Sequence, residues 1–260
     1  MGGLPQNTQA FSFMNIIGII PARYASTRFP AKALADIGGK SMIQRVYEQA
    51  CQAASLTKVV VATDHPLIYT HVREFGGNVV MTAETHPSGT DRCYEALQKV
   101  DSDRTIDYVV NIQGDEPFIQ PAQIELLTDL LDGTVEIATL IKVIDSVETL
   151  FDPHTPKVVV NEHQEALYFS RQTIPFLRGI EPEQWLNEHT YYKHLGIYAY
   201  RADILGQLTQ LQPSSLEKAE SLEQLRWLQH GYRIRVAVTP FDSHGVDLPS
   251  DLERIKKFLG

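Results

Sequence analysis

The most informative stretch of the sequence is IIGIIPARYASTRFPAKALADIGGKSM, residues 16–42. It opens with a continuous apolar run at 16–20, which is typical of a strand buried on both faces of a sheet. A long loop follows, and no helical pattern begins before about Ser41. Similar apolar runs occur at 58–62, 78–81 and 108–112, separated by helix-period segments near 42–54, 67–75 and 91–100. This alternation predicts an α/β fold whose mixed, mostly parallel sheet carries helices on both faces.

The pattern changes after about residue 133. Strand-like runs then follow one another closely, with few helices between them, at 136–143, 156–160, 166–170, 195–201 and 232–238. We predict a β-rich excursion at 145–200, serving as a lid or an oligomer interface. Two helices are expected near the end: one with its leucines from Leu216 to Leu228 on one side and ending at Gly231, the other at 250–259.

Length and composition fit one cytoplasmic enzyme-sized domain. With 260 residues, 43% hydrophobic and 21% charged, the chain can bury a sizeable core, so we expect a single domain at 14–260. Residues 1–13 precede the first strand-like run, and we expect them to form a flexible polar leader. The apolar stretches are too short to span a membrane, and the first residues lack the features of a signal peptide. Two cysteines favour a reducing compartment, and the net charge of −9 argues against a nucleic-acid or anionic-membrane surface.

The loop after the first strand has the composition of an anion cradle. It carries Arg23, Arg28 and Lys32 among small residues such as Ala22, whose backbone N–H groups can approach a phosphate closely. Loops at the carboxyl ends of parallel strands are where α/β folds bind ligands. The glycine patterns of P-loops and dinucleotide-binding loops are absent from the sequence, which disfavours those two classes. The simpler alternative is a solvated basic loop.

Two aspartates follow strand-like runs and could serve a cation. The run YVVNIQGDEP brings Gln113, Gly114 and Asp115 to the edge of the sheet, where a carboxylate suits Mg²⁺ together with substrate phosphates. Asp247, in HGVDLP, again lies between a strand and a helix. Each has a simpler interpretation, because Asp115 could cap a turn and Asp247 could be a helix-entry residue. The segment THPSGTDR at 85–92 could likewise do no more than cap a helix through Ser88 or Thr90.

The run PARYASTRFPAK resembles the signature loop of the sugar-activating nucleotidylyltransferases, in particular the 3-deoxy-D-manno-octulosonate (Kdo) cytidylyltransferases. The resemblance extends from about Asn15 to the C-terminus. Further matching runs are HPSGTDR (86–92), NIQGDEP (111–117), ALYFSRQTIPF (166–176), YKHLGIYAYR (192–201), LEKAESLEQLR (216–226) and HGVDLPSDLERI (244–255). It implies a Rossmann-like nucleotidylyltransferase fold with a nucleotide-binding part at 14–133 and a sugar-binding and dimerisation part at 134–260.

The resemblance also implies the reaction: transfer of CMP from CTP to Kdo, with release of pyrophosphate, for lipopolysaccharide synthesis. It implies Mg²⁺ as the cofactor, held by Asp115 and Asp247, and a homodimer. The implied catalytic residues are Arg23, Lys32, Asp115 and Asp247. The implied nucleotide-binding residues are Pro21, Ala22, Arg23, Arg28, Lys32, Thr82, Ser88, Gly89, Thr90, Gln113, Gly114 and Asp115. The implied sugar-binding residues are Gln113, Arg171, His194, Tyr198, Glu223 and Gln224.

The residues implied to bind the sugar have ordinary alternatives. Arg171 can pair with a carboxylate through two parallel hydrogen bonds, but it could equally be a surface charge. His194 and Tyr198 are four apart and point the same way if the run is extended, although Tyr198 could be a core aromatic. Glu223 and Gln224 lie off the leucine side of their predicted helix and could form a solvated face. Without the resemblance, these alternatives would be preferred.

The chain departs from the family pattern at Ala31, Ala33, Ser41 and Leu248. Alanine at position 31 is unfavourable if the backbone there needs a positive φ. The main rival substrates are an amino-substituted Kdo and a sialic-acid-like sugar. A rival of another class is a non-catalytic nucleotide-sugar binding protein, against which the four implied catalytic residues argue.

Overall fold

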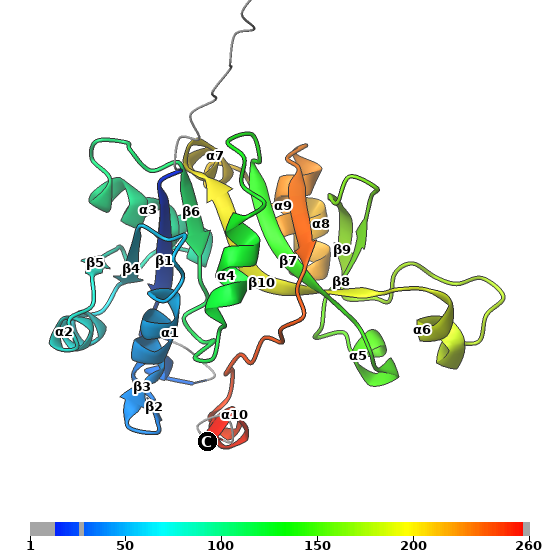
Figure 1. Cartoon of the computed structure of the whole chain (residues 1–260), viewed down its shortest axis with the longest axis horizontal. Coiled ribbons are helices and arrows are strands. Elements are labelled where there is room, and N and C mark those ends of the chain that lie inside the picture. The colour runs from blue at the N-terminus through cyan, green and yellow to red at the C-terminus, as the bar shows by residue number, and fades with distance from the viewer. Residues whose placement is uncertain (1–13, 26–28, 257–260) are drawn as a thin grey trace, which may run out of the picture.

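The structure is a computed structural model of the chain, and it describes residues 14–25 and 29–256 (Figure 1). The predicted leader at 1–13 lies outside these residues. The described chain forms a nine-stranded sheet whose main path runs in the order β11-β7-β10-β6-β1-β4-β5. These strands are β1 (Ile16–Ala22), β4 (Lys58–Thr63), β5 (Val79–Met81), β6 (Tyr108–Asn111), β7 (Ile137–Val143), β10 (Tyr192–Arg201) and β11 (Ile234–Val238).

The first half of the chain is the parallel half of this sheet, as predicted. Strand β1 pairs in parallel with β4 on one side and β6 on the other, and β4 pairs in parallel with β5. The connecting helices are α1 (Met42–Ala50), α2 (Pro66–Glu74), α3 (Gly89–Val100) and α4 (Pro121–Thr128). The hydroxyl oxygen of Ser41 accepts a hydrogen bond from the Gln44 amide and caps α1, which fixes the end of the long loop.

Helices cover both faces of the sheet, and β1 shows why. Ile16 and Ile20 belong to one buried cluster, which includes residues of α1 and α4, whereas Ile17 and Ile19 belong to a second cluster with residues of α3. Successive side chains of a strand point to opposite faces, so an uninterrupted apolar run is buried on both. The α/β fold with helices on both faces is therefore confirmed (Figure 1).

The second half adds antiparallel pairing and the predicted β-rich excursion. Strand β10 runs antiparallel between β6 and β7, and its first residues also pair with β8 (Lys157–Val160), which forms a hairpin with β9 (Ala166–Ser170). Residues 145–191, here called the outer arm, extend to the right in Figure 1. Besides the hairpin, the outer arm contains α5 (Val147–Phe151), the short 3₁₀ helix η2 (Pro182–Gln184) and α6 (Trp185–Glu188).

The prediction of one continuous helix from Leu216 to Gly231 is wrong. The segment forms two short helices, α8 (Ser215–Glu220) and α9 (Gln224–Gln229), because Ser221 adopts a left-handed conformation with φ 52°. The Leu222 amide then donates to the Glu217 carbonyl and closes α8. Leu216 is 36% exposed while Leu225 is buried, so the leucine stripe does not form one buried face.

The remaining elements flank this framework. They are η1 (Lys32–Leu34), β2 (Asp36–Ile37), β3 (Lys40–Ser41), α7 (Ala202–Leu208) and α10 (Pro249–Lys256). The predicted C-terminal helix is thus present, with residues 257–260 outside the described range. Within that range, no helix has the length and apolar character needed to cross a membrane.

Candidate active site

A pocket opens at the carboxyl ends of β1 and β6, the edge at which α/β sheets bind ligands. Its walls come from the loop after β1, the turn before α3, the loop after β6 and the segment before α10. The lining residues are Pro21, Ala22, Arg23, Lys32, Ala33, His86, Pro87, Ser88, Gly89, Arg92, Gln113, Gly114, Asp115 and Asp247. The structure therefore brings together all four of the implied catalytic residues and most of the implied nucleotide-binding residues. Arg28 lies outside the described residues.

Close backbone packing shapes the floor of the pocket. A Cβ atom at Gly114 would lie 2.8 Å from the carbonyl oxygen of Pro21, closer than side-chain carbons approach a backbone. At Gly89 it would lie 3.4 Å from the Pro21 ring, an ordinary van der Waals contact. Gly114 therefore lets the loop after β6 approach the Pro21 backbone closely, which leaves backbone groups near any bound ligand.

The positively charged side chain of Lys32 lies between two carboxylates that line the pocket. The Lys32 ammonium donates to Asp115 Oδ2 at 2.6 Å and lies 3.7 Å from Asp247 Oδ1. It also donates to the Val246 carbonyl oxygen at 2.8 Å. The Asp247 amide donates to the Asp251 carboxylate at 2.9 Å, which orients the segment entering α10. Residues more than 80 positions apart thus converge on one positive charge.

The donor set of this cluster suits Mg²⁺. Carboxylate oxygens are hard ligands, and Mg²⁺ is commonly held by one or two carboxylates together with substrate phosphates. No group of three or more histidine, cysteine, aspartate or glutamate side chains in the described ranges could hold a metal by itself. Asp115 and Asp247 therefore fit a metal that arrives with a phosphate ligand, not a site closed by protein ligands alone.

Next to Asp115, burial raises the pKa of the Glu116 carboxyl to about 7, an effect that its hydrogen bond with Ser243 partly offsets. The Asp115 charge raises it further. Glu116 can therefore remain protonated near neutral pH, which limits the negative charge gathered at this edge of the sheet. The sequence placed Glu116 there but gave no sign of its raised pKa.

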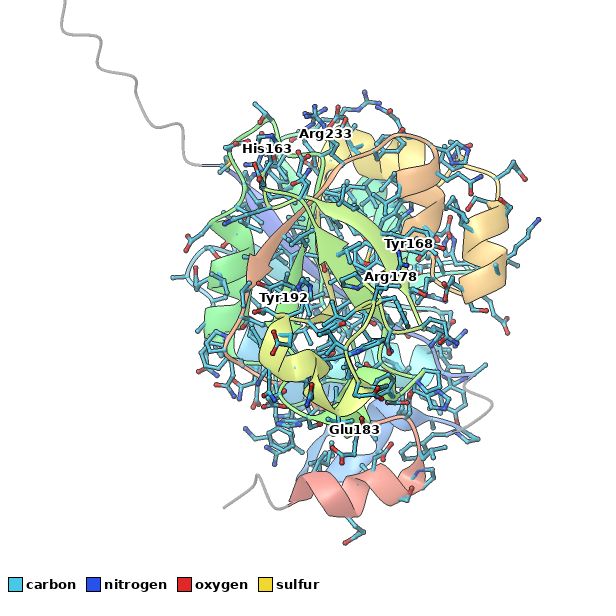
Figure 2. All side chains as sticks on the ribbon, turned by 90° about the vertical axis from the view of Figure 1, so that its right-hand side faces the viewer. His163, Tyr168, Arg178, Glu183, Tyr192 and Arg233 are labelled. Carbon is cyan, nitrogen blue, oxygen red and sulfur yellow. The ribbon has the colours of Figure 1, made fainter. Side chains whose placement is uncertain are left out.

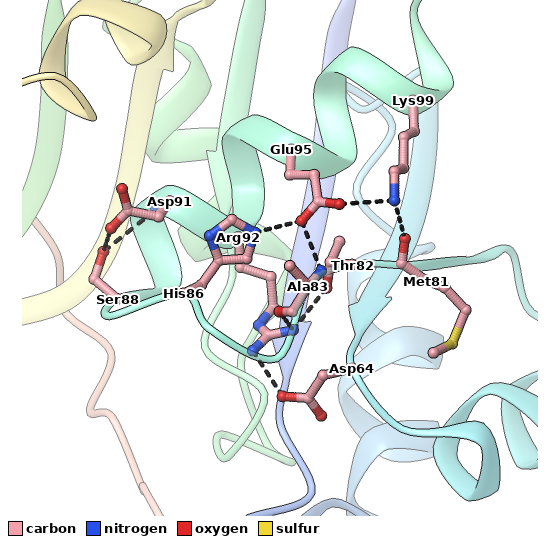
Figure 3. Close-up of polar contacts among 10 residues, drawn as sticks. All are labelled: Asp64, Met81, Thr82, Ala83, His86, Ser88, Asp91, Arg92, Glu95 and Lys99. Atoms are coloured by element: carbon pink, nitrogen blue, oxygen red, sulfur yellow. Dashed lines mark hydrogen bonds and ion pairs between the residues drawn. The ribbon is translucent and has the colours of Figure 1, made fainter.

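The turn before α3 is held by a polar network (Figure 3). Ser88, not Thr90, is the N-cap: its hydroxyl oxygen accepts from the Asp91 amide. Arg92 is 3% exposed, and its Nη1 atom donates to the Thr82 hydroxyl at 2.6 Å. Thr82 lies in this network and outside the pocket lining. Sequence reasoning did not assign Arg92, although HPSGTDR contains it; a buried arginine beside a ligand loop is recognisable only from contacts.

Of the implied sugar-binding residues, only Gln113 lines the pocket, and the others lie on β10, directly after β9 and in the α8–α9 pair. Gln113 Nε2 donates to the Gly196 carbonyl at 2.7 Å, within the bulge of β10. Glu223 accepts a hydrogen bond from the Thr90 hydroxyl at 3.0 Å, so it joins the α8–α9 pair to the turn before α3. Burial raises the pKa of Glu223, and the interpretation of Glu223 and Gln224 as a solvated face is wrong, since Gln224 is 5% exposed.

His194 and Tyr198 face the same way, as predicted. The β10 strand inserts two extra residues between them relative to β7, so the parity of the strand is kept, and their ring centroids lie 5.2 Å apart. Burial lowers the pKa of His194 to about 3, so its ring is neutral at physiological pH. The Tyr198 hydroxyl and the Gln224 amide nitrogen are buried and have no hydrogen-bond partner among the described residues. Such atoms are costly unless water or a ligand pairs with them.

Arg171 does not reach the pocket lining. Its guanidinium donates to three backbone carbonyls, at 2.7 Å to Glu220, 3.1 Å to Pro153 and 3.3 Å to Ser221. Its amide also donates to the Glu220 carboxylate. These contacts fasten the outer arm to the end of α8. They exclude a simple solvated surface charge, and the assignment of Arg171 to a sugar carboxylate stays a prediction.

The cytidylyltransferase family model matches residues 17–234. The chain belongs to the cytidylyltransferase family. The 3-deoxy-manno-octulosonate cytidylyltransferase of Cytophaga hutchinsonii is 58% identical over 245 residues, which cover 94% of this chain and 97% of the relative. The enzyme of the same name from Parabacteroides distasonis is 55% identical over 251 residues, covering 95% and 98%.

Solved structures agree with this cytidylyltransferase membership. A CMP:2-keto-3-deoxy-manno-octonic acid synthetase in complex with CTP superimposes with a TM-score of 0.87 at 44% identity, over 94% of this chain and 98% of that one. A 4-diphosphocytidyl-2C-methyl-D-erythritol synthase from Anaerococcus prevotii superimposes with a TM-score of 0.61 at 11% identity, over 95% and 99% of the two chains. The second match shows a shared fold alone.

Proposed function

We propose that this protein transfers CMP from CTP to 3-deoxy-D-manno-octulosonate, giving CMP-Kdo and pyrophosphate, and so activates Kdo for lipopolysaccharide synthesis. The observation that carries the proposal is the convergence of Lys32, Asp115 and Asp247 beside the basic loop of Arg23. The near full-length relatives bearing the name 3-deoxy-manno-octulosonate cytidylyltransferase, and the similar structure with bound CTP, support the choice of both substrates.

In this reaction a sugar hydroxyl oxygen forms a bond to the α-phosphorus of CTP, while the bond from that phosphorus to the β-phosphate oxygen breaks and pyrophosphate leaves. Positioning and charge neutralisation carry most of such a phosphoryl-type transfer. We assign Arg23, Arg28 and Lys32 to the triphosphate. Binding of a polyanion would draw the Lys32 ammonium toward the phosphates and free oxygen atoms of Asp115 and Asp247.

We assign Mg²⁺ to Asp115 and Asp247. When bound, Mg²⁺ would neutralise phosphate charge and lower the pKa of the attacking hydroxyl. The chain itself supplies the two carboxylates and offsets their repulsion with Lys32 until substrate arrives. It joins their two segments through the hydrogen bond from the Val246 amide to the Asp115 carbonyl at 3.0 Å. Activity that survives a chelator would remove this assignment.

We assign the Kdo subsite to Gln113, Arg171, His194, Tyr198, Glu223 and Gln224. The unpaired polar atoms of Tyr198 and Gln224 support this, because sugar hydroxyls are suitable partners for both. Neutral His194 can hydrogen-bond but does not add charge, so Arg171 would have to leave some of its carbonyl contacts to meet the sugar carboxylate.

The deciding experiment is a metal-dependent assay of pyrophosphate release over a panel of nucleoside triphosphates and acidic sugars. We expect CTP with Kdo to turn over well and uncharged hexoses not at all. A site built to hydrogen-bond particular groups rejects analogues that lack them. A preference above about tenfold, ~1.4 kcal/mol, for an amino-substituted Kdo would change the sugar but keep the reaction. No turnover with any pair would reject the function.

We also propose that the enzyme works in the cytoplasm, where CTP is made.

We further propose that the protein is a homodimer whose interface is formed by the outer arm. Phe151 and Phe176 are 43% and 72% exposed and pack against Trp185, and Leu167 on β9 is 59% exposed. The outer arm, in which Tyr168, Arg178 and Glu183 are labelled, faces the viewer in Figure 2. Clustered exposed apolar side chains mark interaction surfaces. Phe176→Asp should produce monomers in light-scattering measurements, whereas Leu67→Asp on α2, 54% exposed, should not. An unchanged mass for the Phe176 variant would reject this interface.

A further inference from the structure

Asp64, which follows β4, lies where two ligand-binding loops meet. Its side chain is 7% exposed, and its two oxygen atoms serve different segments. Oδ1 accepts a hydrogen bond from the Tyr24 amide at 3.1 Å, in the loop that carries Arg23. Oδ2 accepts from Arg92 Nη2 at 2.7 Å, on α3 (Figure 3). One carboxylate therefore joins the basic loop to α3.

Arg92 extends this connection to the turn before α3. Its Nη1 atom donates to the Thr82 hydroxyl at 2.6 Å and to the Ala83 carbonyl at 3.3 Å, and its side chain is 4% exposed. From the other side, the Glu95 carboxylate accepts from the Ala83 amide and from His86. The segment that turns into the pocket is thus fixed by contacts at Thr82, Ala83 and His86.

The residue after Asp64 secures the same point of the basic loop by a different contact. The His65 and Tyr24 rings are stacked, with centroids 3.8 Å apart and planes 13° apart. The His65 ring also accepts from the Leu67 amide and caps α2, which fixes its orientation. Tyr24 is therefore held by its backbone through Asp64 and by its ring through His65.

We propose that Asp64 is a positioning residue that sets the basic loop and the turn before α3 at the correct separation for one nucleotide. The inference rests on the proposed cytidylyl transfer. The basic loop is assigned to the triphosphate, and we assign the turn before α3, with its pocket-lining residues Ser88 and Gly89, to the base. Asp64, which does not line the pocket, therefore affects both halves of CTP without touching it. A small misplacement of groups around a substrate can cost large factors in rate.

The test compares Asp64→Asn with two partial variants. Asp64→Asn removes the charge that pairs with Arg92 and leaves a group of the same size. We expect its KM for CTP to rise at least about tenfold, its KM for Kdo to stay within about twofold, and its preference for CTP over UTP in kcat/KM to fall at least about fivefold. His65→Ala should raise the KM for CTP and leave that preference unchanged, whereas Arg92→Lys should lower the preference.

The matched control is Glu217→Gln. Glu217 pairs with Arg226 at 2.5 Å with side chains 15% and 13% exposed, in α8 and α9. Its loss should lower the melting temperature without changing the CTP preference. Asp64→Asn with wild-type KM and CTP preference would overturn the inference while the proposed function stands, and an inactive wild type would reject both. If Asp64→Asn does not fold, the two partial variants decide: an unchanged CTP preference in Arg92→Lys, or an unchanged KM in His65→Ala, overturns it.

Discussion

The parallel half of the sheet and the antiparallel half place their functional residues in different ways. In the parallel half, β1 and β6 end at the same edge, and the polar loops that follow them meet in one pocket. In the antiparallel half, the residues assigned to the sugar lie on the bulged β10, the end of β9 and the α8–α9 pair, and Arg171 is bound to backbone carbonyls. In the parallel half, a functional residue is located by its place directly after a strand. In the antiparallel half, its location depends on the strand register and on bulges.

The largest expected effect tests the two carboxylates of the pocket. Asp115→Asn and Asp247→Asn should each lower kcat at least about 100-fold, ~2.7 kcal/mol, because each removes a charged oxygen that we assign to Mg²⁺. Steady-state kinetics with a Mg²⁺ titration measure this, and circular dichroism controls for the fold. Near-normal rates in both variants would show that the two carboxylates do not hold a metal.

The next effect tests whether the antiparallel half forms a separate subsite. Arg171→Ala should raise the KM for Kdo by orders of magnitude, since losing a charge-assisted pair costs about 2–5 kcal/mol, with CTP binding preserved. Arg23→Ala should weaken CTP binding and leave the KM for Kdo nearly unchanged. Calorimetric titration with CTP and kinetics with Kdo separate the two. Equal weakening of both substrates by Arg171→Ala would mean that the halves do not act as separate subsites.

A smaller effect concerns pH and the half-buried ring of His194. Burial lowers its pKa from 6.5 to about 3, so the unfolded chain binds the proton more tightly than the folded chain. The stability that this contributes is present above about pH 6.5 and is lost as pH falls toward 3. His194→Phe should therefore flatten the free energy of unfolding between these values, and exposed His163→Phe should not. If the free energy of unfolding falls equally steeply with pH in the wild type and in His194→Phe, the lowered pKa of His194 is contradicted.

The smallest effect concerns the loop that joins Arg23 to Lys32. Ala31 has φ 55° and ψ 26°, a left-handed conformation that costs a non-glycine residue about 1 kcal/mol. Ala31→Gly should therefore raise the free energy of unfolding by up to ~1 kcal/mol, measured by urea denaturation. Ala35, with φ −60°, is the control, and its change to glycine should destabilise. A destabilised Ala31→Gly would show that chain entropy outweighs the local strain.

The sequence predicted the parallel half well. Runs such as IIGII and YVVNI specify buried strands, and the polar residues after them had to share one edge, so Arg23, Lys32 and Asp115 were expected near one another. Asp247 was joined to them only by the resemblance to the family. It failed for the helix at 216–231, because apolar spacing alone does not show that Ser221 turns left-handed. It also gave no sign that Arg171 fastens the outer arm to the end of α8.

Local spacing and the chemistry of single residues were enough to predict the alternation of strands and helices, the basic loop and the two aspartates. The contacts between these parts were not predictable in this way: Lys32 lies between carboxylates far apart in the chain, Glu223 contacts Thr90, and Asp64 joins Tyr24 to Arg92. Those contacts depend on how loops from distant strands pack at one edge, and on burial that no local pattern records. The pKa values of Glu116 and His194 follow from the same burial.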